Sequence, residues 1–261
     1  MTLPQPSDGF EWTQAPWGPV LRCRPLAEIA DHFFTGGNLE LRDSREEWNQ
    51  VAELIGLDFE RVLLLRQVHR ADVAVRHRGE YESGPRPEAD IAVTNDPTIA
   101  LGIRVADCAP ILIADRRTLA VGAAHAGWRG TVQGAAIAAV RGMQKAFGSR
   151  PADLITAIGP CLGACCGEVG PEVVEAFRQA GHSAESIDRW LTKGSTDRFQ
   201  LDLPRANRDQ LASAGIPPAQ IHAAGLCTKS FPDVFHSYRV QKERAGRMVG
   251  IVRANSENAD F

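Results

Sequence analysis

The middle of this chain is a succession of short apolar runs, and this pattern limits the possible folds more than any other feature. Six runs follow one another between a helical pattern at 44–56 and a longer one that begins near 131: 61–68, 71–76, 91–94, 99–105, 109–114 and 119–124. Short apolar runs bounded by turn residues are typical of strands. Because these strands do not alternate with helices, we expect an α/β (α+β) fold of mixed β-sheet layers with flanking helices, not a regular Rossmann winding.

Helical patterns lie on both sides of this β-rich region. A capping box at 44–47 begins a helix that Gly56 ends, and an Ala-rich helix is predicted from 131 to 147, closed by Gly148. Further helices are predicted at 171–181 and 205–214, and further strands at 154–158, 199–203, 221–225 and 248–252. We expect one domain over residues 1–261, with a frayed end at 254–261.

The charges of the chain nearly cancel, since 29 basic and 32 acidic residues give a net charge of −3. This balance offers no broad cationic field, so we expect no nucleic-acid and no membrane partner. The sequence shows no secretory signal and no apolar stretch near the roughly 18 residues of a membrane span, which indicates the cytoplasm. In that compartment, the six cysteines are expected to be core residues, metal ligands or nucleophiles.

Three thiol and imidazole side chains stand at the ends of predicted strands. His69, Cys108 and His125 are separated by 39 and 17 residues, which does not fit a zinc finger. Three ligands from three strand ends suit a catalytic zinc that keeps its fourth position open. The alternatives are an ordinary core cysteine with hydrogen-bonded histidines, a zinc that is only structural, or a metal-free thiol nucleophile at Cys108 with His69 or His125 as its base.

A candidate anion site adjoins the second histidine. Gly127 and Gly130 surround Arg129 directly before the predicted Ala-rich helix, and backbone N–H groups at a helix start bind anions. Alternatively, the two glycines only permit the turn. Arg239, near the end of the chain, either pairs with the same phosphate or is a surface charge.

The loop at 159–170 contains three cysteines and four glycines. Cys161, Cys165 and Cys166 either line a pocket, supply a nucleophile or fill a tight loop. Their spacing is not that of a zinc knuckle, because no second Cys-x-x-Cys or histidine is near.

Eight short motifs follow one another within residues 30–252. They are Arg66-Gln-Val-His69, Ala106-Asp-Cys108, His125-Ala-Gly-Trp-Arg-Gly130, Gly159-Pro-Cys161, Glu168-Val-Gly170, Cys227-Thr228, Ser237-Tyr-Arg239 and Gly246-Arg-Met248. In their order and spacing the chain resembles the laccase-domain family. Its members are read as zinc-dependent purine nucleoside phosphorylases and were formerly classed as multicopper polyphenol oxidases.

This resemblance implies that His69, Cys108 and His125 bind one zinc ion per chain. It also implies phosphorolysis of adenosine, inosine and methylthioadenosine to free base and ribose 1-phosphate, together with adenosine deamination. We expect a monomer or homodimer whose partners are nucleoside and phosphate. Related bacterial members imply an alternative, the editing of mis-built peptidoglycan precursors in the cytoplasm.

Two positions depart from the family pattern. The stretch at 34–38 lacks the arginine of the family's Thr-Arg-x-Gly-Gly, and Gly167 stands where members typically carry a tyrosine. Both departures leave the zinc ligands in place and change the expected contacts with substrate and phosphate.

Zinc in an open site lowers the pKa of its bound water to about 7, and Asp107 is predicted to carry the proton during attack on C6 of adenine. Arg129 and the Gly127 and Gly130 amides would hold phosphate, with Arg239 assisting. A multicopper cluster needs many histidines in His-x-His pairs, and the seven histidines here include no such pair. Copper-dependent oxidation of phenols is therefore expected only as a side activity, since copper competes well for Cys and His ligands.

Overall fold

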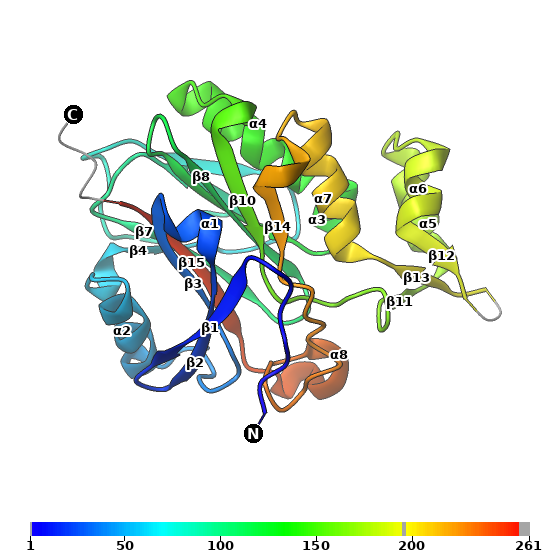
Figure 1. The fold of residues 1–261 in the computed structure, drawn as a ribbon, viewed down its shortest axis with the longest axis horizontal. Coiled ribbons are helices and arrows are strands. Elements are labelled where there is room, and N and C mark those ends of the chain that lie inside the picture. The colour runs from blue at the N-terminus through cyan, green and yellow to red at the C-terminus, as the bar shows by residue number, and fades with distance from the viewer. Residues whose placement is uncertain (1, 195–196, 256–261) are drawn as a thin grey trace.

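A computed structural model describes residues 2–194 and 197–255, and within them fifteen strands form three sheets (Figure 1). The first sheet has the order β1 (Phe10–Ala15), β2 (Gly18–Cys23), β3 (Ala30–Thr35), β15 (Met248–Ala254), β7 (Ala100–Val105) and β4 (Val62–Leu64). The second has the order β14 (Ile221–Ala223), β10 (Leu154–Ile158), β8 (Ala109–Asp115), β9 (Val121–Ala126), β6 (Ile91–Thr94) and β5 (Val73–Arg76). The third is small and consists of β11 (Glu168–Val169), β13 (Phe199–Leu201) and β12 (Leu191–Lys193).

Both large sheets are mixed, as the sequence predicts. The pairs β4–β7, β10–β14 and β5–β6 are parallel, and the other strand pairs are antiparallel. Among the described strands, β15 comes last in the sequence, but it lies between β3 and β7, inside the first sheet.

The helices are short and mostly lie outside the sheets. They are α1 (Arg24–Ala27), α2 (Arg45–Leu54), α3 (Trp128–Val132), α4 (Ala135–Phe147), α5 (Pro171–Gln179), α6 (Ala184–Trp190), α7 (Leu203–Ser213) and α8 (Tyr238–Gln241), with single 3₁₀ turns at Phe59–Arg61, Pro151–Asp153, Pro218–Gln220 and Lys242–Arg244. Each of the described helices is too short or too polar to cross a bilayer.

The two large sheets pack face to face and are covered by helices on their outer faces. Phe34 and Leu101 of the first sheet share one buried cluster with Leu112 and Val121 of the second. On the outer faces, α2 packs on the first sheet around Trp48, while α4 and α7 cover the second (Figure 1). Each large apolar side chain buried this way contributes about 1.5–3 kcal/mol, so the layers hold the loops at the strand ends firmly in place.

Some expected elements occur with their predicted bounds and others are wrong. The strand expected at 61–68 covers only 62–64, as β4. The strand at 154–158 is β10, and Ser44 Oγ accepts the Glu47 N–H at 3.4 Å at the start of α2. The single Ala-rich helix is instead two helices, α3 and α4, because Gly134 has a φ of +75° and breaks the helical path. The expected fraying at 254–261 falls mostly outside the described residues, since only 254 and 255 are described.

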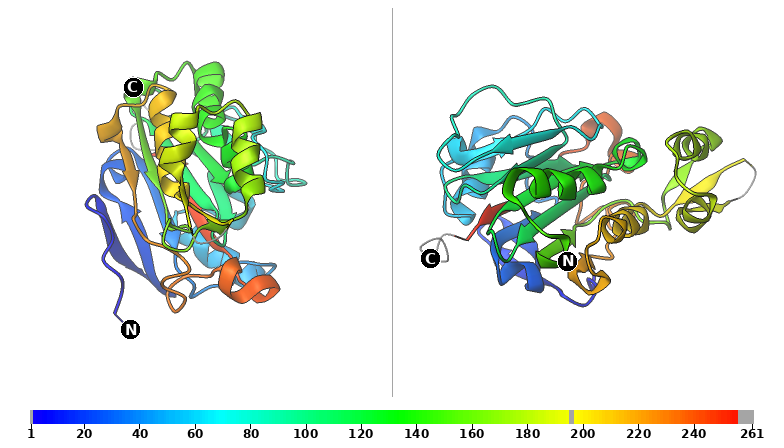
Figure 2. Two further views of the ribbon diagram at one scale, coloured as in Figure 1. Left: turned by 90° about the vertical axis from the view of Figure 1, so that its right-hand side faces the viewer. Right: turned by 90° about the horizontal axis from the view of Figure 1, so that it is seen from above.

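A lobe projects from one end of this two-sheet body (Figure 2). It consists of α5, α6 and the third sheet, and it follows the cysteine-containing loop at 159–170. Its apolar side chains, among them Phe177 and Trp190, continue the cluster that lies under α4 and α7. The lobe therefore has a packed base beside α3.

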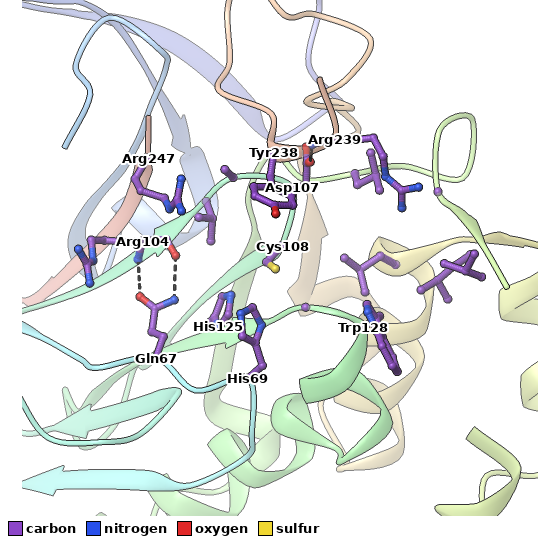
Figure 3. A pocket seen from close by; sticks show the side chains of 18 of the residues that line it. Gln67, His69, Arg104, Asp107, Cys108, His125, Trp128, Tyr238, Arg239 and Arg247 are labelled. Atoms are coloured by element: carbon purple, nitrogen blue, oxygen red, sulfur yellow. Dashed lines mark hydrogen bonds between the residues drawn. The ribbon is translucent and has the colours of Figure 1, made fainter. Parts of the chain in front are cut away.

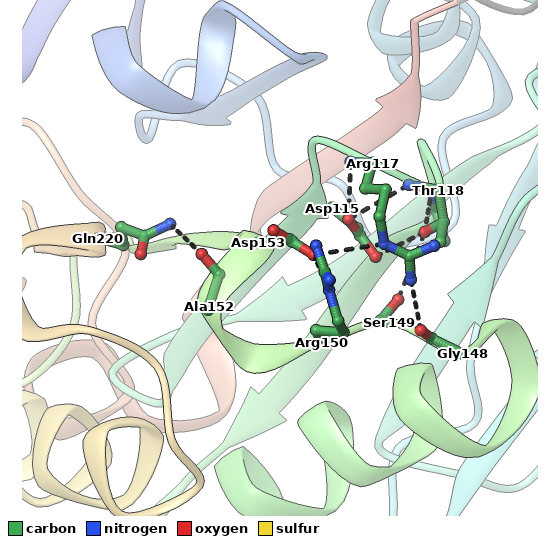
Figure 4. A network of polar contacts seen from close by, with 10 residues as sticks. Asp115, Arg117, Thr118, Gly148, Ser149, Arg150, Ala152, Asp153 and Gln220 are labelled. Carbon is green, nitrogen blue, oxygen red and sulfur yellow. Dashed lines mark hydrogen bonds and ion pairs between the residues drawn. The ribbon is translucent and has the colours of Figure 1, made fainter.

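A polar network ties the chain together at one end of β8 (Figure 4). Arg117 donates to the Gly148 carbonyl at 2.5 Å and lies 3.3 Å from an Asp153 oxygen, which also accepts from Arg150 at 2.6 Å. This network holds the end of α4 against β8 and β10. The opposite end of β8 begins directly after Cys108 and takes no part in this network.

Candidate active site

Three side chains predicted from the sequence converge at that end of the sheets (Figure 3). His69 comes from the loop after β4, Cys108 from the turn between β7 and β8, and His125 from β9. Their potential ligand atoms all lie within 4.8 Å of one another. The two imidazole centroids are 4.8 Å apart, with an interplanar angle of 61°. His125 is buried, Cys108 is partly buried and His69 is exposed, so the cluster opens on one side.

Asp90, which the sequence pattern does not single out, orients this cluster. Its carboxylate is fully buried and lies 2.7 Å from His125 Nδ1. The same carboxylate accepts three backbone N–H groups at 2.8–3.1 Å, those of Val68, His69 and Arg70. One carboxylate thus holds the His69 loop and leaves His125 Nε2 facing the cluster. The sequence signal that could have identified Asp90 is its place, as an acidic residue directly before the apolar run at 91–94.

The metal-free cluster carries charge. Burial raises the pKa of the Cys108 thiol, but the charge of His125 and hydrogen bonds from both histidines outweigh it and lower this pKa to about 6. Burial lowers the pKa of His125, but Cys108 and Asp90 raise it to about 9. Both shifts favour a thiolate beside an imidazolium in the metal-free cluster. A thiolate and two imidazoles are ordinary zinc ligands, so the donor set fits that ion once His125 loses its proton.

Two residues of the site have left-handed backbone conformations. The φ angles are 61° at His69 and 82° at Asp107, which cost about 1–3 kcal/mol each for residues other than glycine. The Asp107 carboxylate accepts the Thr228 hydroxyl and the Arg239 backbone N–H, both at 2.6 Å. These two bonds connect the turn that carries Cys108 to the C-terminal part of the chain.

The predicted anion-binding residues are split between two environments. Gly127 lies against the thiol, since a Cβ there would stand 2.6 Å from Cys108 Sγ. Gly130 is buried beneath the site, and Arg129 is exposed with its guanidinium carbon 4.3 Å from the Trp128 ring centroid. Gly127, Trp128, Asp107 and Arg239 line the cavity described next, whereas Gly130 and Arg129 are not among its lining residues.

A cavity of about 850 Å³ opens above the cluster, between the two-sheet body, the lobe and the C-terminal segment. Its wall contains one carboxylate, Asp107, and five cationic side chains among the described residues, namely Arg66, Arg104, Arg239, Lys242 and Arg247. Apolar side chains complete it, including Leu162 of the cysteine-containing loop and Leu201 and Leu203 of the lobe side. Such a lining suits a small organic molecule with an anionic group.

Arg104 and Arg247 lie together on one side of Cys108, and Trp128 lies on the other (Figure 3). Gln67 clamps the Arg104 backbone by two hydrogen bonds, at 2.8 and 2.9 Å. Arg104 Nε is buried without a hydrogen-bond partner, and burial together with the charges of Arg86 and Arg247 lowers the pKa of Arg104. Within the described residues, neither Arg104 nor Arg247 has a carboxylate within 4.0 Å, so this side of the cavity is prepared for an anion.

Comparisons with known proteins agree with this architecture. Residues 40–255 match the family model described as multi-copper polyphenol oxidoreductase laccase. The chain is 33% identical to "Purine nucleoside phosphorylase YlmD" of Geobacillus stearothermophilus over 80% of its own length and 77% of that protein. It is 34% identical to "Adenosine deaminase RL5" of an unknown prokaryotic organism, over 78% and 79% of the two lengths. The crystal structure of the Bacillus licheniformis protein YfiH superimposes with a TM-score of 0.84 at 26% identity, covering 95% of this chain and 100% of that one.

Proposed function

Since this chain belongs to the multi-copper polyphenol oxidoreductase laccase family, we propose that it is a zinc-dependent purine nucleoside phosphorylase that also deaminates adenosine. The observation that carries the proposal is the Cys108, His69 and His125 cluster, which opens into a cavity with a cationic wall. The names of its relatives support both activities. The substrates are then adenosine, inosine or methylthioadenosine, with phosphate.

His69, Cys108 and His125 are the proposed zinc ligands, one ion per chain. A metal ion held there supplies Lewis-acid stabilisation of developing negative charge. Asp90 fixes the orientation of His125 through the 2.7 Å bond at Nδ1. Gly127 leaves room beside the thiol, because any side chain at that position would contact Cys108 Sγ.

Arg104 and Arg247 are the proposed phosphate ligands, with Arg239 at the other edge of the cavity. In phosphorolysis a phosphate oxygen attacks ribose C1′ and the glycosidic C–N bond breaks, leaving its electron pair on the purine. The Arg104 guanidinium, whose buried Nε–H has no hydrogen-bond partner, is proposed to donate to phosphate. The sequence-based assignment of phosphate to Arg129, Gly127 and Gly130 stays a prediction that the same experiment tests.

The purine is proposed to lie against Trp128. This indole lines the cavity, and its ring is already stacked with the Arg129 guanidinium, which fixes its orientation. Asp107 is the proposed proton carrier for deamination, because it is the one carboxylate among the described residues that line the cavity. Each of its oxygens accepts one hydrogen bond, which leaves a second lone pair for a proton.

The test is product analysis on protein of known metal content, incubated with adenosine in the presence and absence of phosphate. Adenine and ribose 1-phosphate that form only with phosphate, and not with Cys108→Ala, support the phosphorylase. Inosine as the sole product supports deamination alone. No turnover of any nucleoside by zinc-loaded protein contradicts the proposal and favours editing of peptidoglycan precursors, whereas turnover of phenols only with added copper marks the oxidase side activity.

A pair of arginine variants locates the phosphate. Arg104→Gln should raise the KM for phosphate about 10- to 100-fold, since a charge-assisted hydrogen bond contributes about 1.5–3 kcal/mol. Arg129→Gln is the matched variant and should change that KM less than threefold. The reverse result would place phosphate at Arg129, as the sequence predicts.

The cytoplasm is the proposed compartment. All six cysteines are free thiols, which is typical of a reducing environment.

A further inference from the structure

A second group of thiols lies outside the cavity lining, in the loop that leads into the lobe. Cys165 and Cys166 are in the turn at 164–166, and Cys227 begins the turn at 227–230. Their three sulfur atoms all lie within 4.8 Å of one another, although Cys227 is about sixty residues away in the sequence. Cys165 is exposed, Cys166 is partly buried and Cys227 is buried.

Backbone pairing brings these thiols together. Cys161 and Cys227 form a parallel bridge, in which the Cys161 N–H donates to the Leu226 carbonyl at 3.2 Å and the Thr228 N–H to the Cys161 carbonyl at 3.1 Å. The Cys166 N–H closes its own turn on Gly163 at 3.0 Å. The two turns are therefore held in a fixed relation before any ligand binds.

We propose that Cys165, Cys166 and Cys227 form a second metal site, which binds a thiophilic d¹⁰ ion, zinc(II) or copper(I), through three thiolates. Tetrahedral coordination with bonds of about 2.3 Å places sulfur atoms about 3.8 Å apart. Sulfurs that already lie within 4.8 Å of one another reach this geometry by small side-chain rotations. Soft thiolate ligands select these two ions over calcium, magnesium and manganese.

The surroundings of the three sulfurs suit coordinated thiolates. The Gly163 N–H donates to Cys227 Sγ at 3.4 Å, an outer contact of the kind that stabilises metal thiolates. The Ser230 hydroxyl lies 3.4 Å from Cys165 Sγ and 3.6 Å from Cys166 Sγ. A water molecule beside Ser230 completes a fourth position for zinc, and the exposed side of Cys165 gives an ion its entry path.

The location of the site indicates a structural role. Leu162 and Gly167, on either side of the first turn, both line the active-site cavity. The Leu162 N–H also donates to the Asp107 carbonyl at 2.8 Å, next to Cys108. A metal that joins the two turns would hold this cavity wall and the base of the lobe together without touching substrate.

Metal content measured by mass spectrometry tests the proposal. The reduced, metal-free full-length protein is dialysed against zinc, and in a second arm against copper(I) without oxygen. We expect two ions per chain in the native protein and one in the double variant Cys165→Ser with Cys166→Ser. Cys108→Ala should retain one ion, at the second site. Cys23→Ala, which removes a buried thiol that belongs to neither cluster, should keep two.

Alkylation provides a readout that does not depend on counting ions. With bound metal, Cys165 and Cys166 should react with iodoacetamide at least tenfold more slowly than in the metal-free protein. The double variant should have an unchanged circular dichroism spectrum, which shows that it still folds. Equal metal content in the native protein and the double variant would overturn the proposal. Failure of nucleoside turnover affects neither readout, so the two proposals fail separately.

Discussion

Replacing Asp90 by asparagine tests whether one buried carboxylate organises the proposed zinc site. Its two oxygens accept four hydrogen bonds: the His69 N–H and His125 Nδ1 on Oδ1, and the Val68 and Arg70 N–H groups on Oδ2. An asparagine amide has only one acceptor oxygen. In either orientation, two of the four donors then face an N–H group instead of an oxygen.

The expected loss follows from these contacts. Two hydrogen bonds to a charged group contribute about 1.5–3 kcal/mol each, so the free energy of unfolding of the metal-free protein should fall by about 3–6 kcal/mol. Removing an outer partner of a ligating histidine lowers metal affinity about 10- to 100-fold. The zinc Kd should therefore rise by that factor, as measured by competition with a chromophoric chelator.

Asp96→Asn is the matched control. Asp96 is also buried and accepts hydrogen bonds from Thr98 and Gly79, but its contacts are remote from the cluster. This variant should lose stability in urea and keep the native zinc Kd. If Asp90→Asn bound zinc as tightly as the native protein, or if Asp96→Asn lost as much affinity, the orienting role of Asp90 would be refuted.

Three further outcomes are expected. Gly127→Ala should weaken zinc binding at least tenfold, because the added Cβ would lie 2.6 Å from Cys108 Sγ. Gly84→Ala should not change zinc binding, because an added Cβ there has no heavy atom within 4 Å. Equal zinc affinities of the two variants in a chelator competition would contradict this prediction. Calorimetry at pH 7.5 in buffers of different ionisation enthalpy should show about one proton released per zinc bound. The reason is that His125, with a pKa of about 9, must become neutral before it can bind the metal. If no proton were released, His125 would be excluded as the proton source. Burial lowers the pKa of His32 to about 4, so the unfolded chain takes up a proton near pH 6.5 that the folded chain takes up only near pH 4. The free energy of unfolding, measured in urea, should therefore keep the whole His32 contribution above pH 6.5 and lose about 3 kcal/mol of it by pH 4. If His32→Gln showed an equal fall, other groups would be responsible.

Local patterns predicted the elements that depend on nearby residues. The strand at 154–158 and the Ser44 cap are determined within a few residues, and both occur as expected. The break at Gly134 was missed because a glycine inside an Ala-rich run is compatible with a continuous helix, and only tertiary packing selects its positive φ. The strands β1 to β3 were also missed. Of these, β1 and β2 form a local hairpin, and only β3 pairs with β15, more than two hundred residues away.

The same distinction applies to the site. The thiol and imidazoles at 69, 108 and 125 could be proposed because they end apolar runs, and the structure brings them together. Asp90 and Arg104 could not, since each acts through a contact between distant segments, to His125 in one case and to Gln67 in the other. That residues 1–261 form one domain stays a prediction.

The central place of β15 has a consequence for how the chain is made. The ribosome delivers this strand after the strands β1 to β3 and the pair β4–β7 have emerged. Until then the two groups are separate part-sheets with unpaired edges, which are open to association with other nascent chains. A nonsense codon a few positions before Met248 would therefore remove the strand that joins the two groups, and the shortened product should aggregate instead of folding with reduced activity.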